Sequence, residues 1–146
     1  MHKVIVTGVT GFIGQALCLA LLEKNIIVYG IGRNQKKLDR LEINENFHGL
    51  NLDFNEYSDM DKLIKERDFD CFFHLANYGV NGEEKEDYKI QLKNTMIACE
   101  AVELAHAFGC RRFIFVGSVD EFEACSLPDS NYQCPTHSRI YGTTKY

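Results

Sequence analysis

Several features that mark particular classes of protein are missing from this sequence. In its 146 residues no run approaches the roughly 18 apolar residues that a membrane-spanning helix needs. The first apolar stretch, VIV, is very short and is followed at once by Gly8, so we expect no signal peptide. The sequence has no internal repeat and no low-complexity segment. We therefore expect a cytoplasmic protein that has no membrane partner.

Cysteines at metal-ligand spacing are also missing. None of the six cysteines forms a CxxC pair or a similar spacing, so we expect no metal site. Without a secretory signal, we interpret them as free thiols that pack mostly as small apolar side chains. Positive charge is not in excess either, because the net charge is −5. This balance gives no electrostatic reason to expect nucleic acid as a partner.

Short runs of β-branched and aromatic residues are present and recur along the chain. They are almost continuously apolar, which is typical of strands buried on both faces of a parallel sheet. The runs lie at 3–7, 26–31, 47–52, 70–76 and 112–117.

Helical patterns separate these runs. Apolar residues follow the i, i+3, i+4 rule from Ile13 to Leu21, from Tyr57 to Ile64, and over about 85–108, where Gly109 marks the end. Both prolines lie in 118–137, which we expect to be a loop, and a last helix is expected from Ser138. The alternation predicts one domain over 1–146, built on a doubly wound α/β sheet.

Three glycines, Gly8, Gly11 and Gly14, lie between the first predicted strand and the first predicted helix. This context suits a dinucleotide-binding turn. Gly8 allows a tight turn, Gly11 lets the backbone approach a pyrophosphate, and Gly14 lets the helix and the sheet come close. A plain strand-to-helix turn is the alternative.

Five segments together resemble the extended short-chain dehydrogenase/reductase family, which includes nucleotide-sugar epimerases, dehydratases and reductases. The first is the Thr-Gly-x-x-Gly-x-x-Gly loop. The others follow in family order: FFHLAN (72–77), QLKNTMIACEA (91–101), RFIFVGS (112–118) and YGTTK (141–145), which matches the family's Tyr-x-x-x-Lys. The resemblance implies a Rossmann-like parallel sheet that binds NAD(P).

The resemblance also implies roles for individual residues. Ser118, Tyr141 and Lys145 match the catalytic positions, where the tyrosine exchanges a proton with the substrate, the lysine holds the nicotinamide ribose and the serine orients the substrate oxygen. Cofactor contacts are implied at Gly8, Gly11, Phe12, Ile13, Gly14, Arg33, Asn34, Asp53, Leu75, Ala76, Asn94, Tyr141 and Lys145.

Tyr141 and Lys145 are four residues apart and so share one face of a helix. A free phenol has a pKa of about 10, and we expect the nearby ammonium to favour the phenolate and lower the pKa. An exposed helix face is the alternative interpretation of this pair. Asn94 lies on an otherwise apolar stripe, so we expect its amide to be paired. His74 is expected to be a satisfied core histidine without a catalytic role.

The end of the second predicted strand bears on the choice of cofactor. NAD-preferring relatives carry an acidic residue there that bonds the ribose, but here Gly32 takes that position and Arg33 follows. A guanidinium can pair bidentately with a 2′-phosphate, so we expect NADP to be favoured, with NAD left open. Alternatively, Arg33 merely starts a solvated basic helix. Asp53 matches either the family's acid near the adenine or an ordinary turn aspartate.

The resemblance bears on the reaction as well. The dehydratase subgroup carries an Asp-Glu pair directly after its catalytic Thr, whereas here Val119 precedes Asp120 and Glu121. A one-residue slip changes where both carboxylates point. We therefore expect a nucleotide-sugar epimerase that transfers hydride. A ketosugar reductase using NADP and a non-catalytic dinucleotide-binding fragment are the alternatives.

Members of this family continue beyond the Tyr-Lys helix into further strands and a substrate domain. The resemblance therefore implies that this chain is a truncated cofactor-binding portion, with weak or no turnover on its own. It implies a nucleotide-sugar substrate for the full-length enzyme. It also implies a homodimer, paired through the helix over about 85–108 and the helix from Ser138.

Overall fold

A computed structural model of the chain describes residues 1–121 and 138–145. The described residues group into two compact units. The first, called the sheet unit, consists of Met1–Ala76 and Cys99–Phe115. The second, called the α6 unit, consists of Asn77–Ala98 and the described part of Val116–Tyr146.

Five parallel strands in the order β3-β2-β1-β4-β5 form the centre of the sheet unit. Each strand lies within the run predicted for it or extends one residue beyond. The doubly wound prediction is confirmed, and the order is that of a Rossmann-like fold. The strands are β1 (Lys3–Thr7), β2 (Ile27–Gly32), β3 (Phe47–Asn51), β4 (Cys71–His74) and β5 (Phe113–Phe115).

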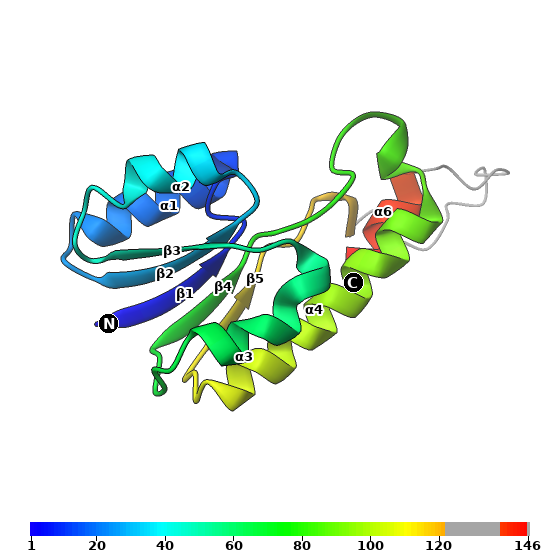
Figure 1. Cartoon of the computed structure of the whole chain (residues 1–146). Helices are drawn as coiled ribbons and strands as arrows, with labels where there is room; N and C mark the ends of the chain where they lie inside the picture. Colours follow the sequence, from blue (N-terminus) through cyan, green and yellow to red (C-terminus); the bar gives the residue numbers. More distant parts are fainter. Residues whose placement is uncertain (122–137, 146) are drawn as a thin grey trace, which may run out of the picture. The chain divides into compact units, whose positions relative to one another are not determined.

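Helices cover both faces of this sheet. Helices α1 (Phe12–Leu22) and α2 (Gln35–Leu41) lie over one face, and α3 (Met60–Leu63) lies on the other (Figure 1). Val4, Ile5 and Val6 of β1 are therefore completely buried. Burial on both faces explains why the strand sequences are continuously apolar rather than alternating.

Two helices differ in detail from the prediction. The period from Tyr57 to Ile64 is divided into the 3-10 helix η1 (Phe54–Asp59) and the single turn α3. The Glu56 N–H donates to the Asp53 carbonyl at 2.9 Å, an i to i+3 bond that tightens the segment. The long helix α4 (Tyr88–Ala107) begins after a separate 3-10 helix, η2 (Gly82–Lys85). It ends at Ala107, two residues before the predicted Gly109, whose φ is +66°.

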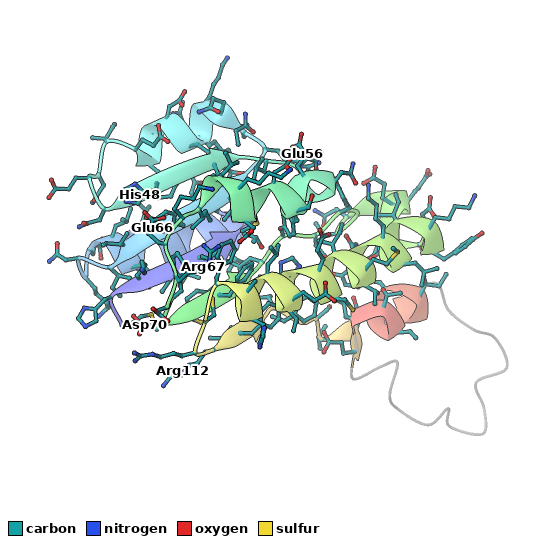
Figure 2. The ribbon with its side chains drawn as sticks, turned by 60° about the horizontal axis from the view of Figure 1, so that its bottom comes forward. His48, Glu56, Glu66, Arg67, Asp70 and Arg112 are labelled. Carbon is teal, nitrogen blue, oxygen red and sulfur yellow. The ribbon has the colours of Figure 1, made fainter. Side chains whose placement is uncertain are left out.

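Charged residues lie at the end of the sheet where strands β1 and β4 begin, and Figure 2 labels Asp70 there. The Asp70 carboxylate accepts the backbone N–H groups of His2 and Lys3. It also lies 3.7 Å from the Arg111 guanidinium. These backbone bonds lower the pKa of Asp70. Asp70 thus links the starts of two neighbouring strands, at the end of the sheet opposite to the glycine loop.

The α6 unit contains η2, the first half of α4 and α6 (Ser138–Lys145). The Thr95 hydroxyl of α4 donates to the Thr144 carbonyl of α6 at 2.9 Å. The predicted loop over 118–137 is wrong at its start, because Asp120 and Glu121 are helical. The rest of that stretch, with both prolines, lies outside the described residues. Across residues 1–121 and 138–145, no helix has the length and apolar character needed to cross a membrane.

Candidate functional site

The predicted site residues fall in both units. Those of the glycine loop, of the segment after β2 and of the end of β4 lie in the sheet unit, together with Asp53. Asn94 and the predicted catalytic residues Ser118, Tyr141 and Lys145 lie in the α6 unit. The described residues contain no group of His, Cys, Asp or Glu that could hold a metal ion.

The glycine loop packs backbone against backbone. Gly8 has a φ of +71°, and a Cβ there would lie 2.8 Å from the Ala76 amide nitrogen and 3.0 Å from the Leu75 carbonyl carbon. A Cβ at Gly14 would lie 2.2 Å from the Gly8 carbonyl oxygen. Both positions therefore require glycine. A Cβ at Gly11 would lie 3.1 Å from the same oxygen, so the protein itself constrains this position less.

The N-terminus of α1 is suited to an anion. Its N-cap residue is Gly11, which makes no side-chain cap, and its first turn contains no acidic residue. Phe12 is 93% exposed and Ile13 is also exposed. Backbone N–H groups at a helix start without a side-chain cap can bind phosphate oxygens. The loop therefore fits the pyrophosphate of a dinucleotide.

Residues after β2 and β3 make contacts with one another. One Arg33 guanidinium nitrogen lies 4.0 Å from Asp53 Oδ2. Asn34 caps α2, because its Oδ1 accepts the Lys37 N–H at 3.1 Å. Lys37 Nζ donates to the Thr10 carbonyl of the glycine loop at 2.9 Å. Asp53 thus faces Arg33 and directly precedes η1.

The connections of the sheet reverse direction between β1 and β4, which is where ligands bind in open α/β sheets. Here the buried His74 places Nδ1 2.9 Å from the Thr7 hydroxyl. Its ring stacks on that of Phe115, with 5.7 Å between the ring centres. His74 is therefore a core histidine, as expected. Its contact with Thr7 joins the two strands at the residue before Gly8.

In the α6 unit, Ser118 starts a helical segment through a capping box. Its hydroxyl oxygen accepts the Asp120 N–H at 3.3 Å, and its own N–H donates to Glu121 Oε1 at 2.7 Å. The Ser118 hydroxyl also donates to Asp120 Oδ2 at 3.2 Å. The Ser-x-x-Glu pattern was a sequence signal for this helix start. The predicted catalytic hydroxyl thus faces a carboxylate from its own segment.

Tyr141 and Lys145 lie one turn apart on α6. Tyr141 is 8% exposed, and Lys145 Nζ lies 5.7 Å from the centre of its ring. The same ammonium donates to the Val116 carbonyl at 3.4 Å. Burial lowers the pKa of Lys145 to about 8, while Glu121 opposes this effect. The pair is therefore enclosed by protein rather than placed on an exposed helix face.

The pKa of Tyr141 moves in the direction opposite to the expected one. Burial raises this pKa, and the Asp120 and Glu121 carboxylates add to the rise. The side chains of Asn77 and Lys85 oppose it. The expectation of a lowered pKa is wrong because desolvation penalises the phenolate more than the neighbouring positive charge favours it. Its surroundings thus favour the neutral phenol over the phenolate.

Lys85, at the end of η2, belongs to the same cluster and was missed by sequence reasoning. Its Nζ lies 2.7 Å from Asp120 Oδ2 and 5.0 Å from the centre of the Tyr141 ring. No motif or spacing connects these three residues, so no sequence signal could have found the contact.

Asn94 holds the loop that follows β4. Its Oδ1 accepts the Tyr78 N–H, and its Nδ2 donates to the Tyr78 carbonyl, both at 2.9 Å. Nδ2 also donates to Gln91 Oε1 at 3.0 Å. The buried amide is therefore paired, as expected from its place on an apolar stripe. Its contact with the cofactor stays a prediction.

Comparison with known proteins agrees with this architecture. The sequence pattern of the NAD dependent epimerase/dehydratase family matches residues 4–146. The chain therefore belongs to the NAD-dependent epimerase/dehydratase family.

Three relatives illustrate the similarity. An uncharacterized protein of Methanocaldococcus jannaschii is 26% identical over 128 residues, which cover 80% of this chain and 39% of that protein. The UDP-Glc/GlcNAc 4-epimerase of Campylobacter jejuni has a TM-score of 0.77 at 18% identity, covering 99% of this chain and 46% of that one. The UDP-glucose 4-epimerase of Bifidobacterium longum, solved with NAD+ and UDP, has a TM-score of 0.70 at 24% identity. The match covers 98% of this chain and 45% of that one.

These similarities show the Rossmann-like fold. The chain spans less than half the length of each of these three relatives. The family is described as NAD-dependent and the Bifidobacterium structure holds NAD+. The expected preference for NADP gains no support from them.

Proposed function

We propose that this chain carries the cofactor-binding and proton-transfer residues of a nucleotide-sugar epimerase. The observation that carries the proposal is the geometry of α6, where the Lys145 ammonium lies 5.7 Å from the ring of the buried Tyr141. Two of the solved relatives named above are sugar-nucleotide 4-epimerases, which supports the same reaction class.

In the proposed reaction, bound NAD supplies hydride acceptor and donor chemistry. The N–H groups at the start of α1 bind its pyrophosphate. In the oxidising step the Tyr141 phenolate takes the proton of the sugar alcohol, and in the reducing step the phenol so formed returns a proton to the sugar carbonyl oxygen. Ser118 orients the substrate oxygen, and Lys145 holds positive charge beside the tyrosine.

We propose NAD rather than NADP as the cofactor. Arg33 is paired with Asp53, so a 2′-phosphate would compete with that carboxylate and be repelled by it. Titration with NADH and NADPH tests this choice in the unaltered chain and in Asp53→Asn. We expect NADH to bind more tightly, and D53N to narrow the difference. Tighter NADPH binding that is lost in Arg33→Ala restores the NADP interpretation.

One assay separates the proposed epimerase from its alternatives. The purified chain is incubated with NAD+ or NADH and UDP-glucose or UDP-galactose, and the sugars and the cofactor are both quantified. Interconversion of the sugars without net change in NADH supports the epimerase, and Tyr141→Phe should abolish it. Net reduction of NAD+ to NADH, with a sugar hydroxyl oxidised to a ketone, indicates a reductase working in reverse. Cofactor binding without either reaction indicates a dinucleotide-binding module, and the absence of binding refutes the proposal.

A further inference from the structure

Lys85 lies beside Tyr141 and beside Asp120, the residue that contacts Ser118, although it belongs to none of the predicted motifs. Its Nζ forms an ion pair with Asp120 Oδ2 at 2.7 Å and lies 5.0 Å from the centre of the Tyr141 ring. The Lys85 side chain is 33% exposed and that of Asp120 is 14% exposed. An ion pair this sheltered is less screened by solvent than a surface pair.

Asp120 extends this contact to the serine. Its Oδ2, which pairs with Lys85, also accepts the Ser118 hydroxyl at 3.2 Å. Its backbone N–H donates to the same hydroxyl at 3.3 Å. The described residues therefore form a continuous path from Ser118 through Asp120 and Lys85 to the ring of Tyr141.

We propose that Lys85 and Asp120 are positioning residues for proton transfer, and that their ion pair joins Ser118 and Tyr141 into one network. This inference rests on the proposed function. Lys85 places a positive charge beside the phenol, and Asp120 both holds that charge and fixes the direction of the serine hydroxyl. Neither residue belongs to the Tyr-x-x-x-Lys motif or to the glycine loop.

The charges around Tyr141 explain why the pair matters. Among the described residues, Lys145 on α6 and Lys85 on η2 place ammonium groups near the ring. Asp120 and Glu121 supply carboxylates that raise the pKa of the phenol. Removal of Lys85 thus leaves the phenol beside two carboxylates with one cation fewer. Removal of the Asp120 charge leaves the phenol with one neighbouring carboxylate fewer.

These two changes have opposite expected effects on the ionisation of Tyr141. Lys85→Met raises the pKa of the phenol because it removes a stabilising positive charge. Asp120→Asn lowers it because it removes a destabilising negative charge. A unit charge about 5 Å away shifts an ionisation by roughly half a pH unit even in a water-like dielectric, and by more in a partly buried site. A merely structural role predicts no such difference in sign.

The test uses the chain with 3,5-difluorotyrosine at position 141, followed by 19F NMR during a pH titration. Fluorination brings the phenol's ionisation near neutral pH. Lys145, whose pKa is about 8, ionises in the same range but is common to every variant, so the midpoints are compared between variants. We expect the midpoint to rise by about half a pH unit or more in K85M and to fall in D120N. Lys85→Arg should restore the wild-type midpoint. Lys89→Met, which removes a lysine placed 6.0 Å from the Tyr88 ring, is the matched control and should leave it unchanged.

Opposite shifts in K85M and D120N support the proposal. Shifts of the same sign, no shift, or an equal shift in K89M overturn it. If K85M does not fold, Lys85→Gln provides the uncharged side chain instead. The titration needs neither cofactor nor sugar, so its result stands apart from the sugar-conversion assay. Opposite shifts in a chain that binds no NADH refute the proposed function and leave the ionic network intact.

Discussion

Replacement of Gly14 by alanine tests how closely α1 packs on the glycine loop. The new Cβ would lie 2.2 Å from the Gly8 carbonyl oxygen and 2.8 Å from Val9 Cα. Both contacts are with backbone atoms, so no change of rotamer relieves the overlap. The first turn of α1 must move away from the loop by roughly 1 Å to regain ordinary contact distance.

The expected loss of stability follows from two opposing effects. Overpacking costs about 1–3 kcal/mol, and the upper end applies here because the contacted atoms belong to the main chain. Alanine is favoured over glycine within a helix by about 1 kcal/mol, which offsets part of this cost. We expect the free energy of unfolding to fall by about 2 kcal/mol. We also expect weaker NADH binding, because the N-terminus of α1 moves with the helix.

Gly11→Ala is the matched control for this experiment. Among the described atoms its Cβ would contact the Gly8 carbonyl oxygen alone, at 3.1 Å, and its backbone is extended with a φ of −79°. Urea unfolding should therefore show a loss of less than about 1 kcal/mol. NADH fluorescence titration follows cofactor binding in both variants. If G14A is as stable as G11A, the reasoning about backbone contact is wrong.

The remaining predictions concern Lys145, two thiols and the contact between β1 and β4. The pKa of Lys145 is about 8 when folded and 10.5 ordinarily, so the unfolded chain binds more protons between these values. In urea unfolding, the free energy of unfolding of the wild type should therefore rise relative to that of Lys145→Met as the pH goes from 8 to 10.5. A difference between the two free energies that stays constant over this range contradicts the prediction. Cys99 is exposed, whereas burial raises the pKa of Cys18 to about 12. Thiol labelling at pH 8 with peptide mapping should modify Cys99 and spare Cys18, and early labelling of Cys18 disproves its burial. Thr7→Val removes the hydroxyl that contacts His74, so urea unfolding should show a free energy of unfolding lower by about 1–2 kcal/mol. Thr7→Ser keeps the hydroxyl and should change this free energy little. Equal stability of the two variants argues against the contact.

Local patterns predicted the sheet well because its strands are buried on both faces. Each of the five apolar runs contains a strand whose limits lie within two residues of the expected ones. The segment after β3 was less predictable, since a 3-10 bond from Glu56 to Asp53 competes with the helical period there. The start of a helix at Ser118 was overlooked although its Ser-x-x-Glu pattern is local.

The charged contacts of the candidate site could not be predicted from local sequence patterns. The pairing of Arg33 with Asp53 depends on β2 and β3 ending side by side. That contact weakens the argument for NADP, which considered Arg33 alone. The raised pKa of Tyr141 likewise depends on burial and on carboxylates from another segment, which the spacing to Lys145 does not reveal.

The sequence by itself determined the parallel sheet, the glycine loop, the family and the Tyr-x-x-x-Lys pair, because these depend on residue types at short, regular spacings. Tertiary structure alone decided the ionic surroundings of Tyr141 and Arg33. Electrostatic effects depend on distance and burial in space. Only the folded chain brings Lys85 of η2 within 2.7 Å of Asp120, and with it a second positive charge to the tyrosine.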